Sequence, residues 1–442
     1  MVKNRKTLSA IIFSLVALLL IGIAIFFLYP KDAEDYTGRQ TSIVTTKIDA
    51  SSTKGKITIE IFFNETEGNY RIYYADASGK SLDGYEAIKE VKINSQNTKI
   101  ILENLILPYK CKGLFIVGEK TSSFVLLPQA YLQEDEYKYR FGAISDIHFN
   151  NGDYLTPALD FLDMQEIDFV AASGDLTNSG ELEYLNKFND VIGDREYKVY
   201  TTSGNHDHVA VKNGDWQKTI NTSIKTDKEV VTIAPNGLDF VFSPKKAENI
   251  VFIFLCQTDW YYPKEPNKNE YTIVKKEQLS WLSSQLEAYK EKTVCLFFHT
   301  FLSSPNGTQD SAAGNILSPG GYSYNLPYSY GTADEIEFRA LLKQYKNVVF
   351  FSGHSHWMYE MEKYNENLNL SNFDGEYCYM VHISSISAPR WIDDDDTERT
   401  DKIGEESEGL IVELYNDYML IIPVDFKTQE FQSEYIKMIP IK

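Results

Sequence analysis

The hydrophobic positions of the 442-residue chain follow three successive patterns. An unbroken apolar run occupies residues 8–29, and short runs of alternating apolar and polar residues extend from residue 43 to about 130. Beyond these runs, short apolar runs alternate with segments that have a helical period. Twofold alternation is typical of half-buried strands, and apolar residues three and four positions apart are typical of amphipathic helices. The pattern predicts a membrane-length helix, an all-β unit and an α/β unit, in that order.

The first run, residues 8–29, contains no charged side chain, and a helix needs about 20 residues to cross a bilayer. Lys3, Arg5 and Lys6 precede it, and acidic residues follow it from Asp32. The positive-inside rule then places the N-terminus in the cytoplasm and the rest of the chain outside. We expect residues 1–30 to be an uncleaved signal anchor of a single-pass cell-membrane protein, and residues 31–42 to be a linker. The alternative is a cleaved signal peptide, whose apolar core usually has about 7–15 residues.

The second pattern, at residues 43–130, predicts a β-sandwich. Turn-forming residues separate its runs, which lie at 56–63, 69–76, 87–93, 98–105, 113–119 and 123–128. Regularly spaced short strands without a helical period are typical of such a fold, and the length and pattern resemble a fibronectin type III or immunoglobulin-like module. The segment contains no histidine, so we expect a spacer or packing unit, with a binding role as the alternative.

The third pattern, at residues 139–442, predicts an α/β domain. Helical periods at 156–165, 180–192, 275–290 and 333–345 are interspersed with apolar runs at 141–145, 168–173, 198–203, 293–298 and 347–352. In such domains, ligands gather beyond the carboxyl ends of the strands. Three more runs at 377–386, 409–416 and 418–426 predict a further sheet with antiparallel pairs.

Polar residues of the types that bind metals come directly after five of these apolar runs. They are Asp146, His148, Asp175, Asn205, His206, Asp207, His299, His354 and His356. Imidazole, carboxylate and amide oxygen are the ligands of borderline divalent ions, and their convergence at strand ends indicates a metal site. Glycines precede Asp175, Asn205 and His354, which fits sharp turns that aim these ligands.

The charge and the cysteine content argue against some classes of protein. The net charge of −20 argues against nucleic acid or another polyanion bound along a broad surface, but it is compatible with a small phosphate ester held by metal ions. Four cysteines do not form a disulfide framework in a chain of this size, and Cys256 and Cys295 lie in apolar runs as small hydrophobic residues would.

The ordered blocks D-x-H, G-D, G-N-H-D, H and G-H-x-H resemble the calcineurin-like metallophosphoesterase superfamily from Tyr139 to the end of the chain. The blocks around Asp146 and Asp175 are most similar to class III cyclic nucleotide phosphodiesterases and related glycerophosphodiesterases. Purple acid phosphatases normally carry a tyrosine where this chain has Asn178, and a glycine where it has His148. The resemblance implies an αββα sandwich of two mixed sheets for this domain.

The resemblance also implies two divalent transition-metal ions, of manganese, iron or zinc. The implied ligands are Asp146, His148 and His356 for one ion, Asn205, His299 and His354 for the other, and Asp175 as the bridge between them. His206 is then left to protonate or stabilise the leaving oxygen, with Asp207 fixing its tautomer.

We therefore expect a membrane-anchored hydrolase that cleaves phosphate esters, phosphodiesters in particular, by attack of a metal-activated hydroxide. Its partners would be a small phosphate ester and, through the anchor, the membrane. A nonspecific phosphatase or nucleotidase is the alternative within the enzymes. A non-catalytic surface binding protein is the alternative outside them, although such a scaffold would be expected to have lost ligands that this chain retains.

Two polar residues near the C-terminus have no role in that scheme. His382 lies in a strand-like run followed by the sequence SSISAPR, and either a structural role or a substrate contact fits it. Arg390 closes this sequence and fits either a phosphate contact or a surface ion pair.

Overall fold

The structure is a computed structural model. It describes residues 39–40, 44–95, 98–119, 121–133, 136–149, 153–193, 195–208, 219–221, 224–258, 260–261, 271–272, 274–301, 332–363, 370–371, 378–392, 398–399 and 406–441. The expected anchor lies outside these ranges, as does the expected linker except for strand β1 (Arg39–Gln40). Within them, no helix is both long and apolar enough to cross a membrane.

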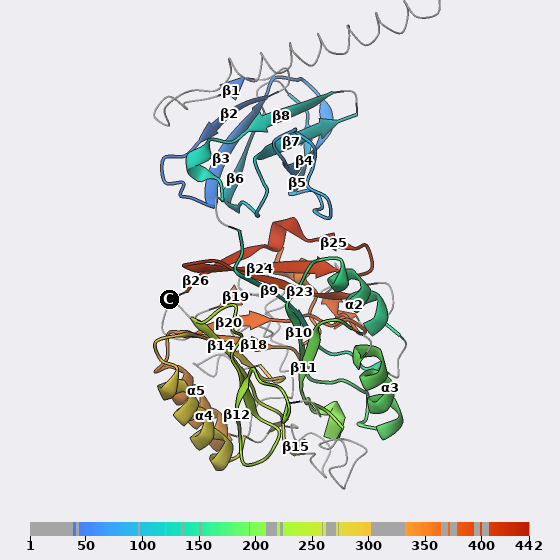
Figure 1. Cartoon of the computed structure of the whole chain (residues 1–442). Helices are drawn as coiled ribbons and strands as arrows, with labels where there is room; N and C mark the ends of the chain where they lie inside the picture. Colours follow the sequence, from blue (N-terminus) through green and yellow to red (C-terminus); the bar gives the residue numbers. More distant parts are fainter. Residues whose placement is uncertain are drawn as a thin grey trace, which may run out of the picture. The chain divides into compact units, whose positions relative to one another are not determined.

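The chain divides into two compact units (Figure 1). The first comprises residues Met1–Leu82 and Lys89–Glu134, and the second comprises Asp83–Ile88 and Asp135–Lys442. The second unit thus includes Asp83–Ile88, which the sequence pattern assigns to the predicted sandwich. In this segment, Glu86 N donates to Phe431 O, and Phe431 N donates to Gly84 O.

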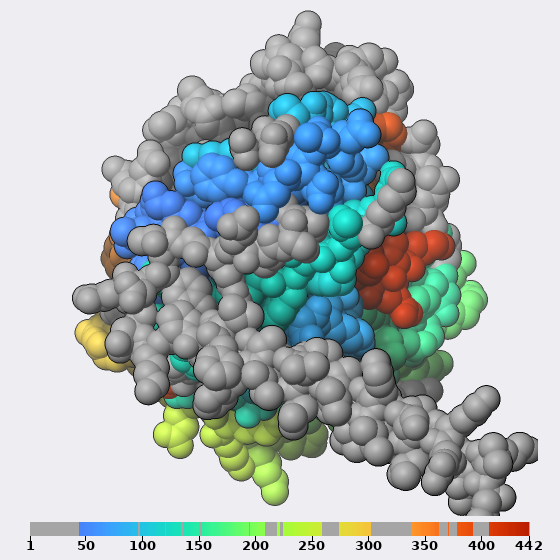
Figure 2. Space-filling view, turned by 90° about the horizontal axis from the view of Figure 1, so that it is seen from above, coloured from blue at the N-terminus to red at the C-terminus, as the bar shows by residue number. Residues whose placement is uncertain are grey.

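The first unit contains two antiparallel four-stranded sheets. One has the order β1-β2-β3-β6, with β2 Val44–Ile48, β3 Lys56–Phe63 and β6 Lys99–Ile106; the other has the order β5-β4-β7-β8, with β4 Gly68–Ala75, β5 Lys89–Ile93, β7 Gly113–Gly118 and β8 Ser122–Leu126. The rings of Phe63 and Tyr70, one from each sheet, lie 5.0 Å apart, so the sheets pack face to face. In β3, buried and half-buried residues alternate, as the twofold pattern predicts. The first strands, coloured blue, form part of the surface in Figure 2.

The second unit contains two mixed sheets, each with seven described strands. The first sheet has the order β11-β10-β9-β23-β24-β25, with β26 also beside β24; its strands are β9 Tyr139–Ile144, β10 Phe169–Ser173, β11 Lys198–Thr202, β23 Glu408–Leu414, β24 Tyr418–Asp425, β25 Glu430–Phe431 and β26 Lys437–Pro440. The second sheet has the order β12-β13-β14-β17-β18-β20-β19; its strands are β12 Val230–Ile233, β13 Phe240–Phe242, β14 Ile250–Phe254, β17 Thr293–Phe297, β18 Val348–Ser352, β19 Leu370–Ser371 and β20 Tyr379–His382. Strands β9, β10 and β11 are parallel, and so are β14, β17, β18 and β20.

Aromatic side chains fill the space between these two sheets. Phe141 of the first sheet meets Phe252 of the second edge-on at 5.2 Å, and Phe297 stacks on Phe351 at 4.7 Å. Helices cover the outer faces (Figure 1): α2 (Leu155–Asp163) and α3 (Leu182–Gly193) lie beside the first sheet, and α4 (Lys276–Ala288) and α5 (Thr332–Leu342) lie beside the second. Burial on both faces explains why the strands are continuous apolar runs.

The four predicted helices of this unit are confirmed as α2, α3, α4 and α5. The three C-terminal runs are strands and the predicted antiparallel pairing is confirmed for β23 and β24, but the prediction that they form a further sheet is wrong. Strands β23 and β24 instead extend the first sheet, because β23 pairs antiparallel with β9. Strand β20 joins the second sheet, parallel to β18. Short antiparallel pairs, β15 (Trp260–Tyr261) with β16 (Tyr271–Thr272) and β21 (Trp391–Ile392) with β22 (Glu398–Arg399), complete the described strands.

Candidate metal centre

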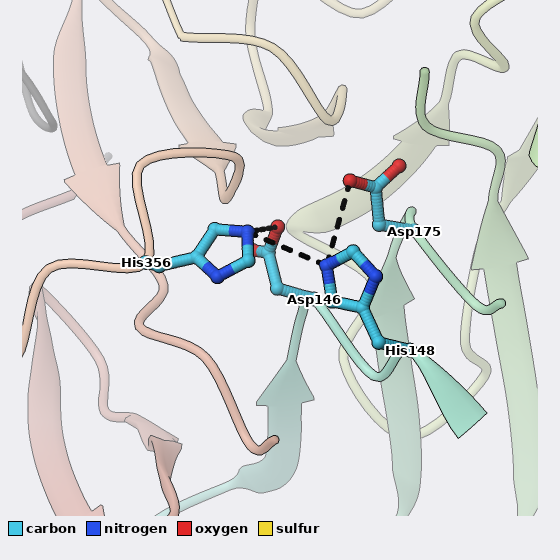
Figure 3. A group of neighbouring side chains, drawn as sticks. All are labelled: Asp146, His148, Asp175 and His356. Carbon is cyan, nitrogen blue, oxygen red and sulfur yellow. Dashed lines mark hydrogen bonds and ion pairs between the residues drawn. The ribbon is translucent and has the colours of Figure 1, made fainter. Parts of the chain in front are cut away.

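The predicted site residues lie in five loops, which follow β9, β10, β11, β17 and β18. Each strand is parallel to another of this set, so the carboxyl ends lie together at the same edge of each sheet. Figure 3 shows four side chains from three of these loops turned toward one another.

Two groups of buried side chains have a geometry that could hold a metal ion. In the first group, Asp146, His148, Asp175 and His356 each offer one ligand atom, and these atoms lie within 4.8 Å of one another. In the second group, Asp175, His299 and His354 do the same. Asp175 belongs to both groups, as a bridging ligand must. We call them the first and second metal groups.

Nitrogen and oxygen atoms approach closely inside each group. His356 Nε2 lies 3.0 Å from Asp146 Oδ1 and 3.4 Å from His148 Nε2 (Figure 3). In the second group, His299 Nε2 lies 3.1 Å from Asp175 Oδ2. Converging lone pairs of this kind repel one another unless a proton or a cation lies among them.

Two further observations show that these residues fit metal ions. The buried Oδ1 of Asn205 accepts no hydrogen bond from the described residues, and an unsatisfied buried acceptor costs about 1–3 kcal/mol. His299 Nδ1 lies 2.6 Å from Ser173 O, and His356 Nδ1 lies 2.8 Å from Ala388 O. Each Nδ1–H donating to a carbonyl leaves the Nε2 lone pair directed into its group, which is the tautomer that a metal ligand requires.

Five of the candidate ligands have left-handed backbone. The φ angles are 52° at Asp146, 43° at His148, 49° at Asp175, 73° at His354 and 62° at His356. This conformation costs a residue with a Cβ atom about 1–2 kcal/mol. Carboxylates of the site help to hold it, because Asp146 Oδ2 accepts a hydrogen bond from His354 N and Asp175 Oδ1 accepts one from His206 N, each at 2.9 Å. No sequence signal predicted this strain.

The glycines that precede the ligands serve two different purposes. Gly174 has a φ of 83°, in agreement with the expected turn. Gly204 does not have a left-handed φ; a Cβ atom there would overlap Asp175 Oδ1, so glycine permits a close approach of two loops. The expectation of a sharp turn is therefore replaced by a packing requirement at Gly204, and the same holds at Gly353, where a Cβ atom would overlap Ser145 Oγ.

The histidines of the site differ in their pKa values. Burial lowers the pKa of His148 to about 4 and that of His354 well below its ordinary value. Burial also acts to lower the pKa of His299, but the carboxylates of Asp175 and Asp146 outweigh it and raise this pKa to about 9. His299 thus balances carboxylate charge with a proton that a bound cation would displace.

The expected hydrogen bond between Asp207 and His206 is not formed. His206 Nδ1 lies 2.8 Å from Asn178 O, so a backbone carbonyl fixes the tautomer. The buried carboxylate of Asp207 instead accepts hydrogen bonds from Gly204 N at 2.9 Å and Thr177 N at 3.1 Å. Asp207 therefore joins the loops after β10 and β11 and does not orient His206.

His382 has a structural position. It is fully buried, its Nε2 lies 2.7 Å from Trp357 O, and its Nδ1 lies 3.2 Å from Ser355 Oγ. Burial lowers the pKa of His382 to about 4, which keeps the ring neutral. His382 therefore supports the loop that carries His354 and His356. Of its two predicted roles, the structural one fits these contacts and the substrate contact does not.

Comparisons with known proteins place this site in context. A family model described as calcineurin-like phosphoesterase matches residues 139–358, which include every candidate ligand. No curated protein matches the sequence. Among solved structures, the chain is similar to PhoD, with 11% identity over 90% of this chain and 92% of that chain and a TM-score of 0.40. It is also similar to purple acid phosphatase PPD1 from yellow lupin (Lupinus luteus), with 13% identity over 90% and 74% and a TM-score of 0.41, and to Vacuolar Protein Sorting 29 from Cryptosporidium parvum, with 10% identity over 70% and 100% and a TM-score of 0.29.

Proposed function

Because the chain belongs to the calcineurin-like phosphoesterase family through residues 139–358 and is a phosphoric ester hydrolase, we propose that its substrates are phosphodiesters. Two divalent transition-metal ions, of manganese, iron or zinc, would be held by the two metal groups. The observation that carries the proposal is the position of Asp175 in both groups of buried ligand atoms. A carboxylate shared in this way is what a two-ion hydrolytic site requires.

The ligand residues would hold and orient the ions. Asp146, His148 and His356 would bind one of them, Asn205, His299 and His354 the other, and Asp175 both. When bound, such a pair supplies a nucleophile of lowered pKa and neutralises charge on the phosphoryl oxygens. The buried apolar strands behind the ligands limit the water around them, which strengthens their electrostatic interactions.

His206 is the candidate proton donor. Burial acts to lower its pKa, but the Asp175 carboxylate and the hydrogen bond to Asn178 O outweigh this and raise the pKa of His206 above its ordinary value. With Nδ1 bound to Asn178 O, the Nε2 proton of the cationic ring is the one available to a leaving oxygen. The ring is half-buried and meets the His148 ring edge-on at 4.7 Å, which keeps it beside the first metal group.

Phosphodiesters are favoured by a resemblance in sequence. The blocks around Asp146 and Asp175 are most similar to class III cyclic nucleotide phosphodiesterases and glycerophosphodiesterases. His206 is placed to protonate the alkoxide that leaves from a diester or from an alkyl monoester, so this residue serves both reactions. A nonspecific phosphatase or nucleotidase is the alternative.

We also propose that the enzyme is anchored in the cell membrane by residues 8–29, with its hydrolase domain outside. The supporting observations are the uncharged length of this run and the basic residues that precede it.

A substrate panel tests the proposed reaction. The full chain, purified in detergent and supplied in turn with Mn²⁺, Fe²⁺ or Zn²⁺, would be assayed on a cyclic nucleotide, a glycerophosphodiester, bis-p-nitrophenyl phosphate and p-nitrophenyl phosphate. We expect a higher kcat/KM for the diesters, loss of activity with a chelator, and no activity in Asp175→Asn. A higher kcat/KM for p-nitrophenyl phosphate than for each of the diesters would establish the nonspecific phosphatase, and inactivity with every metal and ester would favour the binding protein.

A further inference from the structure

We propose that residues 384–390, the serine segment that follows β20, position the ligands of the first metal group directly and reach the second group only through Asp146, whose Oδ2 accepts a hydrogen bond from His354 N. This inference rests on the two-ion site of the proposed function. The segment lies beyond residue 358, where the family match ends. Its sequence, SSISAPR, has no metal-binding signature, and no role was predicted for its serines.

Two hydroxyl groups of the segment converge on one backbone atom of a ligand. Ser385 Oγ and Ser387 Oγ each donate a hydrogen bond of 2.9 Å to the carbonyl oxygen of Asp146. Asp146 has a left-handed φ of 52°, a conformation disfavoured for any residue with a Cβ atom. The two hydroxyls therefore stabilise the peptide orientation that directs the Asp146 carboxylate into the first metal group.

The same segment also holds a second ligand of that group. Ala388 O lies 2.8 Å from His356 Nδ1, and Arg390 N donates a hydrogen bond of 2.8 Å to His356 O. Asp146 and His356 are the pair whose side chains approach to 3.0 Å. In the second group, by contrast, His299 Nδ1 lies 2.6 Å from the carbonyl oxygen of Ser173, the last residue of β10. The segment thus determines the tautomer and position of first-group ligands.

Residues at and just before the start of β23 also hold the serine segment by hydrogen bonds. Ser407 Oγ donates to Ile386 O at 2.8 Å, and Glu408 N donates to Ser385 O at 3.0 Å. Ser385, Ile386 and Ser387 are fully buried. Buried hydroxyls keep their place in a protein interior when they make hydrogen bonds. The segment therefore connects β23 rigidly to the first metal group.

Ser387→Ala is the cleanest test. Ser387 Oγ donates to Asp146 O, whereas Ser385 Oγ also accepts a hydrogen bond from Ala388 N at 2.9 Å. The matched control is Ser203→Ala, because Ser203 is equally buried and its hydroxyl also donates to a backbone carbonyl, Gln257 O, at 2.6 Å. Ser203 lies in the loop that carries the second-group candidate Asn205.

Mn²⁺ would be titrated into the metal-free full chain, with binding followed by calorimetry and by the electron paramagnetic resonance signal of a coupled manganese pair. Removing a group that orients a metal ligand typically costs about 10–100-fold in metal affinity. We expect Ser387→Ala to lower the affinity for one ion by this factor, to lower the affinity for the other ion less, and to replace the coupled signal by that of a single ion. Ser203→Ala should not change the affinity for the ion that Ser387→Ala binds more weakly.

Equal weakening of both ions in Ser387→Ala, or a lower melting temperature with unchanged affinities, would overturn the inference. If Ser387→Ala does not fold, Ser385→Ala is tested against the same criteria. A chain that hydrolyses no phosphodiester but shows the selective loss would overturn the proposed substrate and leave the serine segment's role intact. Binding of fewer than two ions by the unaltered chain would overturn both.

Discussion

Asp175 combines several tasks in the site. Its carboxylate belongs to both metal groups, and its carbonyl oxygen accepts hydrogen bonds from Ile147 N and His148 N at 2.9 Å. We predict that Asp175→Asn, which removes the charge and keeps the shape, loses both ions, whereas His148→Ala loses mainly one. Elemental analysis of the two variants and the unaltered protein measures this. Full metal content in Asp175→Asn would exclude the bridging role.

His206 is expected to act on the leaving group without binding an ion. General-acid assistance contributes about 10²–10⁴-fold, so we predict that His206→Ala loses rate by that factor on an alkyl phosphodiester and keeps its metals. The loss should be smaller on a nitrophenyl ester, whose leaving oxygen needs little protonation. Kinetics on the two substrates test this: equal losses would indicate phosphate binding, and loss of metal would make His206 a ligand.

The loops that carry the ligands approach one another so closely at Gly204 that a residue with a Cβ atom does not fit there. At Gly204, a Cβ atom would overlap Asp175 Oδ1 and lie 2.5 Å from Asp175 N. We predict that Gly204→Ala displaces the bridging carboxylate and reduces metal content. Gly193, at the end of α3, is the matched control, because a Cβ atom there meets no atom within 4 Å. Gly193→Ala should keep full metal content; a Gly204→Ala protein that also keeps it would contradict the packing argument.

Strand β23 begins at a buried acid whose protonation is coupled to stability. Burial raises the pKa of Glu408 to about 8, and the charge of Asp425 adds to this effect. Glu408 Oε1 accepts a hydrogen bond from Gln432 Nε2 at 2.6 Å, and Oε2 accepts one from Tyr359 N at 2.9 Å. A protonated Glu408, or a glutamine in its place, can donate to Gln432 Oε1 once that amide turns over.

The pH dependence follows from the raised pKa. The folded protein holds the Glu408 proton to about pH 8, whereas the unfolded chain loses it near the ordinary value of 4.5. This contribution to stability is complete below that ordinary value and is lost as the pH rises through about 8. We predict that Glu408→Gln, which stays neutral, is more stable than the parent above pH 8, by on the order of a few kcal/mol. Denaturant titrations from pH 5 to 9 measure the difference, and parallel curves would refute the assignment.

The proposed location of the enzyme makes a cellular prediction. If residues 8–29 anchor the chain with its C-terminal part outside, protease added to intact cells should digest the hydrolase domain. A cytoplasmic marker should survive until the cells are permeabilised. A domain that is protected in intact cells would reverse the orientation, and a mature chain that begins near residue 25 would replace the anchor by a cleaved signal.

Local patterns were sufficient to predict the elements of the hydrolase domain and the residues that meet at its strand ends. The apolar runs before Asp146 and Asp175 are strands buried along their whole length, and the run before Asn205 is a strand that ends in three buried residues. Such burial leaves a signal that needs no knowledge of distant residues. Parallel neighbours then bring the residues that follow to one edge. Pairing was less predictable: the run at 377–386 resembles the runs of β23 and β24, yet only long-range packing assigned β20 to the other sheet.

Contacts made to backbone atoms depended on the folded chain. Every residue carries the same carbonyl group, so no sequence pattern indicates that Asn178 O would face His206, or that Ser387, 241 positions from Asp146, would donate to its carbonyl oxygen. The left-handed backbone of the ligands and the true partners of Asp207 arise in the same way, from loops held together by long-range packing. Side-chain types thus identified which groups could bind metal ions, and the packed sheets determined what orients them.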